Sequence, residues 1–355
     1  MTRRLDQFRK RMHQEGLDGF LVLHSFNRNY LSGFTGSSGA LLFGPSKTQF
    51  LTDSRYSVQA KSQVQGAEIV LQTRALLKDA SDLVKKQKIK KLGFESVHVS
   101  HAAFEYLRLE LPKVKLQPTK DLAEGLRLIK DAGEMAKMRA AARITDQTFH
   151  HILGYIKPGV KESDLAVEME HYMRRQGASG PSFETIVASG WRAALPHGVA
   201  SDKKVAKGDM IVFDFGCLLD GYCSDMTRMA CVGRPSSEQK KVYSIVKRAQ
   251  QAGLDLIKAG RKAGQIDEAS RGLIRRAGYG SKFGHSLGHG VGVEVHEEPR
   301  LGPGAANVLQ EGMAVTCEPG IYLEGKFGVR IEDLVLVTKN GHENLYRTSK
   351  ELAVV

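Results

Sequence analysis

The order of hydrophobic and polar positions changes about one third of the way along the chain. Up to residue 122, short apolar runs alternate with segments of helical spacing. The runs that predict β-strands are 17–24, 40–43, 49–52, 68–72 and 91–94, and the segments that predict helices are 5–12, 57–65, 76–86 and 102–109. Strands that alternate with helices in this way are typical of an α/β domain with a mostly parallel or mixed sheet.

After residue 130 the helical period dominates. Asp131 and Glu134 have the spacing of a capping box, and an apolar stripe at three- and four-residue steps follows as far as Ile156. We expect Ser163 to cap the next helix. Further helices are predicted at 237–258 and 266–276, and strands at 313–317 and 329–337. Helices and antiparallel hairpins in separate groups are typical of an α+β domain.

The composition is that of a globular protein large enough for two domains. The chain has 355 residues, of which 41% are hydrophobic and 26% charged, and we expect an α/β domain over residues 1–122 and an α+β domain over residues 123–355. Residues 1–12 are charged and lack the apolar core of a signal peptide, and no run of about 18 uncharged apolar residues is present. Four cysteines without C-x-x-C spacing then predict a cytoplasmic protein with reduced, buried thiols.

The formal net charge of +13 raises the alternative that the chain binds nucleic acid or another polyanion. The basic residues are dispersed, however, and the densest run, 85–91, is typical of a helix end that leads into a strand. A solvated basic surface explains the charge better, so nucleic acid is not the expected partner.

Two aspartates lie on either side of the dipeptide Asp220-Gly221, which favours the two-residue turn of a β-hairpin. With that turn, Asp214 pairs with Thr227 and Gly216 pairs with Asp225, all on one face of the sheet. Asp214 and Asp225 then become diagonal neighbours with Cα atoms roughly 7–8 Å apart. Like charges this close favour a cation between them, and Gly216 leaves room for a group other than a side chain. The alternative is a solvated hairpin with exposed carboxylates.

A second hairpin is predicted near the C-terminus. A three-residue loop at 324–326 places Glu318 directly opposite Glu332, although Pro319-Gly320 favours a bulge there. Both glutamates lie in apolar strands, where a lone charge is costly to bury. Arg330 is on the same face as Glu332 and offers the alternative of a plain ion pair.

Histidines gather between the two hairpins. His285, His289 and His296 lie among four glycines, whose lack of a side chain lets the backbone approach a ligand closely, and imidazole is a common metal ligand. His197 belongs to a separate Leu-Pro-His-Gly segment. The sequence has no H-E-x-x-H motif and therefore no zinc-protease helix. The alternative is a glycine-rich loop with hydrogen-bonded core histidines.

Four carboxylates that converge in a core cannot all ionise without cations. The charge of these four groups, −4, matches two divalent ions. Oxygen-dominated ligation with one imidazole suits manganese, with zinc, cobalt or iron(II) as alternatives. Two such ions a few ångströms apart are a known hydrolytic device. The residues therefore predict a two-metal hydrolase.

The order Asp, Asp, His, Glu, Glu resembles that of the M24 metallopeptidases with the pita-bread fold. The motifs D-F-G, S-D-x-T-R, H-x-x-G-H-G-x-G, H-E-x-P, E-P-G-I-Y and V-R-I-E-D are also similar. The resemblance runs from Leu126 to the C-terminus and implies a curved antiparallel sheet. Residues 29–39 and 52–56 resemble the creatinase/prolidase-like N-terminal domain of Xaa-Pro aminopeptidases and prolidases. Trp191 and Met229 depart from the usual family pattern.

The resemblance implies that five side chains hold the two metal ions: Asp214, Asp225, His289, Glu318 and Glu332. Two of them, Asp225 and Glu332, correspond to ligands that bridge the ions. The residues implied in catalysis are Glu318, His197, His296, His285 and Arg330. In this family Glu318 would accept or shuttle a proton, and His197 and His296 would stabilise the oxyanion. His285 would border the proline pocket, and Arg330 would orient the bridging carboxylate or reach the substrate carboxylate.

The implied reaction is hydrolysis of the peptide bond between an N-terminal residue and proline. Ordinary peptidases handle this bond poorly, because proline lacks an N–H and restricts the residue before it. We expect an Xaa-Pro aminopeptidase, which the segment 34–38 favours, with an Xaa-Pro dipeptidase (prolidase) as the alternative. The resemblance also implies a homodimer in which the neighbour's N-terminal domain helps to close the active site. A binding protein without catalysis, or a metal-free creatinase-like hydrolase, would have lost ligands that this chain retains.

Overall fold

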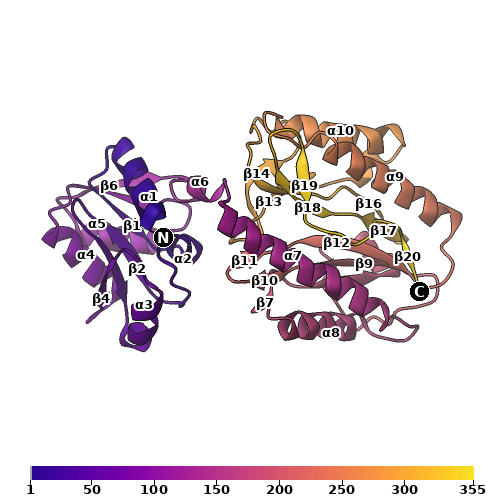
Figure 1. Ribbon diagram of the computed structural model, residues 1–355, viewed down its shortest axis with the longest axis horizontal. Helices are drawn as coiled ribbons and strands as arrows, with labels where there is room; N and C mark the ends of the chain where they lie inside the picture. Colours follow the sequence, from indigo (N-terminus) through magenta and orange to yellow (C-terminus); the bar gives the residue numbers. More distant parts are fainter. Residues whose placement is uncertain (1) are drawn as a thin grey trace. The chain divides into compact units, whose positions relative to one another are not determined.

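The structure is a computed structural model that describes residues 2–355, and the chain divides into two compact units after Arg127. The elements of the N-terminal unit are α1 (Thr2–Gln14), β1 (Gly19–Val22), α2 (Ser25–Ser32), β2 (Ala40–Phe43), β3 (Thr48–Thr52), η1 (Ser54–Tyr56), α3 (Ser57–Gln63), β4 (Glu68–Leu71), α4 (Leu76–Lys86), β5 (Lys91–Glu95), α5 (His101–Glu110), β6 (Lys115–Thr119) and α6 (Glu124–Arg127). Figure 1 shows this alternation of strands and helices in indigo and purple.

One six-stranded sheet in the order β4-β3-β2-β1-β5-β6 forms the centre of the N-terminal unit. β2 runs antiparallel to β1 and β3, and the other three neighbouring pairs are parallel. Helices α4 and α5 pack together over a core that includes Leu21, Leu42 and Leu92. The prediction of an α/β domain with a mixed sheet is therefore confirmed.

Helix α2 has no counterpart among the predicted elements. Its sequence looks polar, yet Asn27 and Arg28 are buried. Asn27 donates to Glu95 Oε1 at 2.8 Å, and Arg28 donates to the carbonyls of Gly36 and Gly39, both at 2.8 Å. Because these polar side chains are satisfied by distant partners, the hydrophobic period did not show the helix.

The C-terminal unit contains long helices and short antiparallel strands. Its elements are α7 (Ala132–Leu153), α8 (Glu162–Arg175), β7 (Gly180–Pro181), β8 (Ile186–Ser189), η2 (Gly190–Ala194), β9 (Met210–Phe215), β10 (Cys217–Leu219), β11 (Tyr222–Cys223), β12 (Met226–Cys231), α9 (Ser237–Leu254), α10 (Ala263–Arg276), η3 (Gly280–Lys282), β13 (Gly288–Gly290), β14 (Glu297–Leu301), β15 (Ala314–Cys317), β16 (Gly320–Leu323), β17 (Phe327–Arg330), β18 (Asp333–Val337), β19 (His342–Asn344) and β20 (Ala353–Val354).

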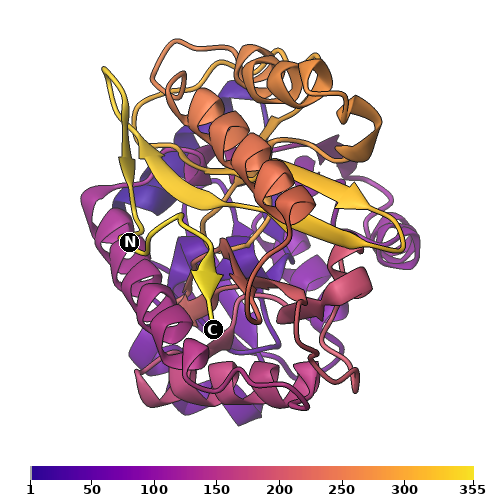
Figure 2. The same ribbon diagram turned by 90° about the vertical axis from the view of Figure 1, so that its right-hand side faces the viewer.

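These strands form four small sheets, the largest in the orders β20-β12-β9-β8 and β14-β13-β15-β18-β19. All pairings in the two larger sheets are antiparallel except β12 with β20. α9 packs against α10 and against β15, β16 and β17, and Figure 2 shows it lying across the yellow strands. α7 packs against α8, β10 and β11 (Figure 1). The prediction of an α+β domain is confirmed.

Two helix starts test the capping predictions. Asp131 and Glu134 form a capping box at the start of α7, as predicted. Ser163 does not cap α8, because it already lies inside the helix, which begins at Glu162 with Lys161 in the N-cap position. The side chain of Glu162 is buried and accepts hydrogen bonds from residues of the segment 189–201. A local capping rule does not take such distant contacts into account, and the prediction was therefore wrong.

The first hairpin has the predicted register. Asp214 pairs with Thr227, and the turn residues Asp220 and Gly221 have φ angles of 48° and 79°, as a type I′ turn requires. Gly216 does not leave room for a ligand, however. A Cβ at this position would lie 1.8 Å from the carbonyl oxygen of Ser224, so the glycine is needed for close contact between backbone segments.

The second hairpin also has the predicted register. Gly320 pairs with Arg330 on one side of the two glutamates, and Cys317 pairs with Asp333 on the other. Glu318 and Glu332 lie at opposite positions between these pairs, where the ladder changes from one sheet to the other.

A buried ion pair joins the two hairpins. Arg228 on β12 donates to Asp333 Oδ1 at 2.6 Å and to the backbone carbonyls of Thr227 and Glu332. Burial alone would raise the pKa of Asp333, but Arg228 and then Lys350 outweigh it and lower the pKa to about 2. This contact fixes the strand of Glu332 beside the strand of Asp225.

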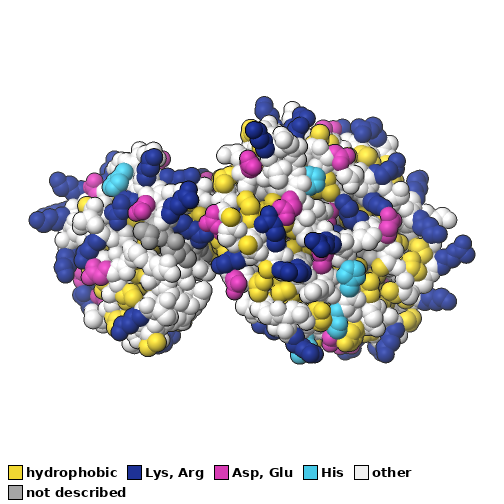
Figure 3. Space-filling view, in the orientation of Figure 1, with side chains coloured by type: hydrophobic (Ala, Val, Ile, Leu, Met, Phe, Trp, Pro, Cys, Tyr) yellow, Lys and Arg dark blue, Asp and Glu magenta, His cyan; other side chains and the backbone are white. Residues whose placement is uncertain are grey.

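The surface and the thiols agree with the composition. On the face shown in Figure 3, Lys and Arg side chains are scattered among Asp and Glu. All four cysteines are free and buried, as predicted. Among residues 2–355, no helix combines the length and the apolar character that crossing a membrane requires.

Candidate functional site

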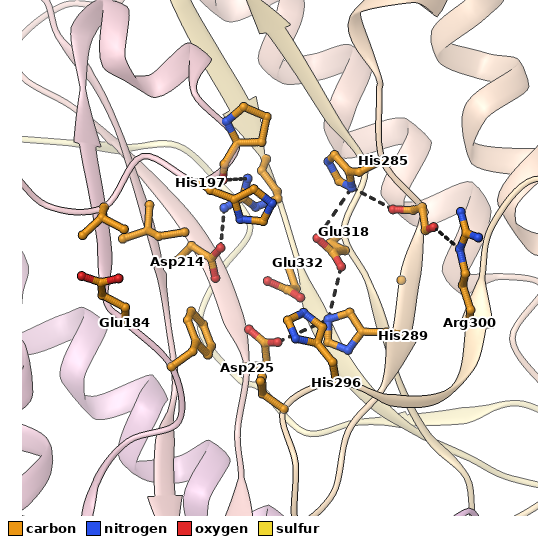
Figure 4. Close-up of a pocket in the computed structure, with 18 residues that line it drawn as sticks. Glu184, His197, Asp214, Asp225, His285, His289, His296, Arg300, Glu318 and Glu332 are labelled. Atoms are coloured by element: carbon orange, nitrogen blue, oxygen red, sulfur yellow. Dashed lines mark hydrogen bonds and ion pairs between the residues drawn. The ribbon is translucent and has the colours of Figure 1, made fainter. Parts of the chain in front are cut away.

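A pocket of about 580 Å³ in the C-terminal unit is lined by both hairpins and by the glycine-rich segment between them. A volume of this size suits a small organic ligand. Figure 4 shows that histidines and carboxylates converge on this pocket. All nine residues singled out in the sequence line it: His197, Asp214, Asp225, His285, His289, His296, Glu318, Arg330 and Glu332.

The imidazole of His289 lies beside two of the acidic residues. Its Nε2 atom is 3.5 Å from Asp225 Oδ2 and 3.4 Å from Glu318 Oε1. One ligand atom from each of Asp225, His289 and Glu332 lies within 4.8 Å of the other two. Three different chain segments thus bring donor atoms to one point.

His289 is neutral, with its free nitrogen directed at the carboxylates. Its Nδ1 atom lies 3.0 Å from the carbonyl oxygen of Gly290, so this nitrogen carries the proton. Burial, and then the neighbouring His296, lower the pKa of His289 to about 4. Nε2 therefore keeps a lone pair that a metal ion can accept.

The carboxylates repel one another inside the protein. Burial, and then Glu332 and Asp214, raise the pKa of Asp225 well above its usual range, and burial and Glu332 do the same for Glu318. Burial and the nearby Asp214 raise the pKa of Glu332 to about 8. Without a cation, this cluster holds protons at neutral pH.

The donor set fits divalent metal ions. Asp214 Oδ1 is buried without a hydrogen-bond partner, while Oδ2 of the same carboxylate is paired with Arg330. A single guanidinium cannot neutralise four carboxylates, and an unpaired buried oxygen is costly unless it binds a cation. Four carboxylates and one neutral imidazole are ligands that Mn²⁺ and related ions accept.

Arg330 forms an ion pair with Asp214. The alternative of a plain ion pair between Arg330 and Glu332 is not what the structure shows. The Nε atom of Arg330 donates to Thr227 Oγ1 at 3.1 Å, and Thr227 donates in turn to Glu332 Oε2 at 2.7 Å. Arg330 thus touches one carboxylate directly and orients a second through a hydroxyl group.

His285 forms part of the pocket wall with both ring nitrogens engaged. Nδ1 lies 2.8 Å from the carbonyl oxygen of Ser286, and Nε2 lies 2.8 Å from the hydroxyl of Tyr322, which accepts from Arg330 Nη1 at 2.8 Å. Burial, and then the positive charge of Arg330, lower the pKa of His285 to about 4. The neutral ring is therefore held in one orientation.

His197 and His296 face the space in front of the carboxylates (Figure 4). The ring centre of His296 is 4.2 Å from that of His289, and burial lowers the pKa of His296. His197 follows Pro196, whose carbonyl accepts from Arg330 Nη1 at 3.0 Å. Both imidazoles can donate a hydrogen bond into the pocket.

The sequence reasoning did not single out three further residues of this region. Thr227 and Tyr322 lie in the quoted motifs, and their alternation with Arg330 and Glu332 could have shown them. Tyr346 lies in none of the sequence motifs, yet its hydroxyl accepts from the N–H of Asp225 at 2.9 Å and donates to the carbonyl of the same residue at 2.5 Å. Only the fold brings this tyrosine to the hairpin of Asp214 and Asp225.

Comparison with known proteins covers both units. Residues 136–339 match metallopeptidase family M24, and residues 4–129 match the creatinase/prolidase N-terminal domain. The chain is 43% identical to an uncharacterized peptidase of Bacillus subtilis, over 99% of this chain and 100% of that protein. It is similar in structure to an Xaa-Pro dipeptidase from Bacillus anthracis, with 43% identity, a TM-score of 0.96 and 99% of both chains covered.

A second similar structure is an X-Pro aminopeptidase from Thermotoga maritima, with 40% identity, a TM-score of 0.90, and 98% of this chain and 100% of that chain covered. Matches of this extent and identity show the family, the pita-bread fold, the use of divalent metal and the hydrolysis of peptides. The chain belongs to metallopeptidase family M24 and carries a creatinase/prolidase-like N-terminal domain.

Proposed function

We propose that this peptidase hydrolyses the bond between an N-terminal residue and proline. The observation that carries the proposal is that four carboxylates and the neutral imidazole of His289 line one pocket of an M24 chain. The B. anthracis dipeptidase and the T. maritima aminopeptidase, both similar over nearly the whole chain, support proline as the second residue of the substrate.

Five residues of the pocket would hold two divalent ions, preferably manganese: Asp214, Asp225, His289, Glu318 and Glu332. When bound, such ions polarise the scissile carbonyl and make water nucleophilic at neutral pH. As the family resemblance implies, Asp225 and Glu332 would be the ligands common to both ions.

The remaining polar groups of the pocket act on the substrate and on protons. A carboxylate oxygen of Glu318 accepts a proton from the attacking water and passes it to the leaving proline nitrogen. His197 and His296 donate hydrogen bonds to the oxygen that gains negative charge in the transition state. His285, fixed by Tyr322, forms a wall against which the proline ring packs.

The length of the preferred substrate depends on what lies beyond the proline. Arg300 also lines the pocket, and its Nε atom donates to Ser286 Oγ at 2.6 Å (Figure 4). Its guanidinium can pair with the free carboxylate of a dipeptide, whereas a longer peptide presents a neutral amide there. Arg300 thus favours the dipeptidase, which we keep as the alternative, whereas the segment 34–38 favours the aminopeptidase, which we retain as the first proposal.

A peptide panel tests the proposal. With Mn²⁺ added, we expect Ala-Pro-Ala-Ala to be cleaved after the first residue, and Ala-Ala-Ala-Ala to be cleaved at least about 100-fold more slowly, because the pocket selects a ring without an N–H. Release of alanine is measured by chromatography, with chelated enzyme as the control. Cleavage of Ala-Pro alone would leave only the dipeptidase, and equal cleavage of both tetrapeptides would contradict the proposal.

The variant His296→Ala separates catalysis from metal binding. We expect kcat to fall about 10²–10³-fold, because one donor to the oxyanion is lost, while the content of bound metal is unchanged. Metal analysis and steady-state kinetics give the two readings. His171→Ala, an exposed histidine of α8, is the matched control. Loss of metal in His296→Ala would mean that this residue, and not His289, is the ligand.

The proposal also includes the oligomeric state and the cellular location of the enzyme. We propose a homodimer, as the family resemblance implies, whose oligomeric state light scattering will test. We also propose a cytoplasmic location, where the four buried free cysteines stay reduced.

A further inference from the structure

The segment 189–201 carries His197 into the pocket, and one carboxylate holds both of its ends. Glu162 is fully buried at the start of α8. Its Oε1 atom accepts from the N–H and hydroxyl of Ser189 at 2.7 and 2.8 Å. Its Oε2 atom accepts from the hydroxyl of Ser201 at 2.7 Å and from Arg192 Nε at 2.9 Å.

Further bonds extend from this carboxylate along the segment towards His197. Arg192, bound to Glu162, donates through Nη2 to the carbonyl of Val199 at 2.5 Å and so crosses the loop. From the pocket side, Arg330 donates to the carbonyl of Pro196 at 3.0 Å. His197 therefore lies in a loop whose two ends are held by Glu162, and the residue before it, Pro196, is held by Arg330.

The hydrogen bonds described for the Glu162 side chain do not cap its own helix. The N-cap position of α8 is held by Lys161, whose side chain makes no capping bond, and all the side-chain bonds described for Glu162 lead to residues 189–201. A buried charge of this kind gives little stability compared with an apolar group of similar volume, but it can specify one geometry. The geometry specified here is that of the loop that carries His197.

We propose that Glu162 is a positioning residue for catalysis, which places His197 by clamping the segment 189–201. The inference rests on the proposed function, because that function assigns His197 to the oxyanion. It extends the active machinery to a carboxylate on α8 that neither lines the pocket nor belongs to a metal-ligand motif.

The first test does not depend on activity. Trp191 is the single tryptophan of the chain, lies within the clamped segment and is 53% exposed. In Glu162→Gln, we expect the acrylamide quenching constant of Trp191 to rise and its fluorescence anisotropy to fall. The amide keeps only one acceptor oxygen, so either the bonds to Ser189 or those to Ser201 and Arg192 are lost. Glu168→Gln, on the same helix but paired with His151, is the matched control and leaves both values unchanged. Unchanged values in Glu162→Gln would overturn the clamp.

The second test is a double-mutant cycle with His197→Ala. We expect Glu162→Gln to lower kcat about 10- to 100-fold with KM changed less than about threefold, because a displaced donor mainly affects the transition state. In the His197→Ala background, the same substitution causes no further fall in kcat. An equal loss in both backgrounds would mean a general structural role and would overturn the inference.

A milder variant covers the case in which Glu162→Gln does not fold. Arg192→Lys keeps the charge but loses the two-point contact with Glu162 and Val199, and we expect a smaller change of the same kind in quenching and in kcat. Wild-type values in this variant would overturn the inference. If the wild-type enzyme cleaves no proline peptide, the proposed function fails, whereas the fluorescence comparison still decides whether Glu162 holds the loop.

Discussion

Asp225→Asn is expected to abolish hydrolysis of proline peptides and, at the same time, to stabilise the metal-free protein. The amide keeps the shape of the side chain but removes a charge that the two ions would share, and a loss of about 10³-fold or more in kcat/KM corresponds to about 4 kcal/mol. In the metal-free state the same substitution removes one of the mutually repelling carboxylates. We expect a gain of about 1–3 kcal/mol in the free energy of unfolding at pH 8.

A neighbouring aspartate provides the control for this opposite pair of effects. Asp333 is as deeply buried as Asp225, but Arg228 and Lys350 lower its pKa, whereas burial and like charges raise that of Asp225. Asp333→Asn should therefore lower the free energy of unfolding. Peptidase assays with Mn²⁺, and denaturant titrations in EDTA, measure both variants. Full activity in Asp225→Asn, or a loss of stability like that of Asp333→Asn, would contradict its assignment as a metal ligand.

The sequence predicted the parts of the site that depend on strand alternation and turn chemistry. The dipeptide Asp220-Gly221 fixes the first turn, and the opposite position of Asp214 and Thr227 follows by counting along two strands. In the second hairpin, the loop length places Glu318 opposite Glu332 in the same way. Register is local information, because a slip of one residue would turn every side chain to the other face of the sheet.

The supporting contacts could not be predicted, because they join segments far apart in the chain. Arg228 reaches residues about 100 positions away, and Tyr346 meets the backbone of Asp225 at a separation of 121 residues. Arg228 closes the quoted motif S-D-x-T-R, but the motif does not reveal which residues it contacts, and Tyr346 belongs to no motif that distinguishes it from an ordinary tail residue. The burial of Asn27 in α2 and of Glu162 in α8 has the same origin, since tertiary hydrogen bonds override local propensity.

The glycine opposite Asp225 shows how a correct register can still lead to a wrong detail. Counting along the hairpin places Gly216 correctly, but it does not show what fills the space left by the missing side chain. The carbonyl oxygen of Ser224 and the hydroxyl of Ser182 occupy it. The acidic groups face a pocket formed with the second hairpin and the histidine segment, and the hairpin alone does not create that pocket.

The metal-free protein is expected to lose stability as the pH rises from 6.5 to 8. Burial and Asp214 raise the pKa of Glu332 to about 8 in the folded chain, against an ordinary value of 4.5. The folded state therefore binds more protons than the unfolded state in this range, and the free energy of unfolding falls with pH. For Glu332 alone the loss is about 2 kcal/mol, and the raised pKa values of Asp225 and Glu318 act in the same direction.

The pH window matters because the buried histidines act in the opposite direction. The pKa values of His285 and His289 are lowered to about 4 from an ordinary 6.5, so their contribution to stability grows between pH 4 and 6.5 and is constant above pH 6.5.

Guanidinium titrations in EDTA, followed by the fluorescence of the single tryptophan, Trp191, report on the C-terminal unit. Mn²⁺ should restore stability most strongly at pH 8, since metal and protons compete for the same carboxylates. A midpoint in EDTA that rises between pH 6.5 and 8 would mean that the four carboxylates do not repel one another, and with that the case for two shared cations would fail.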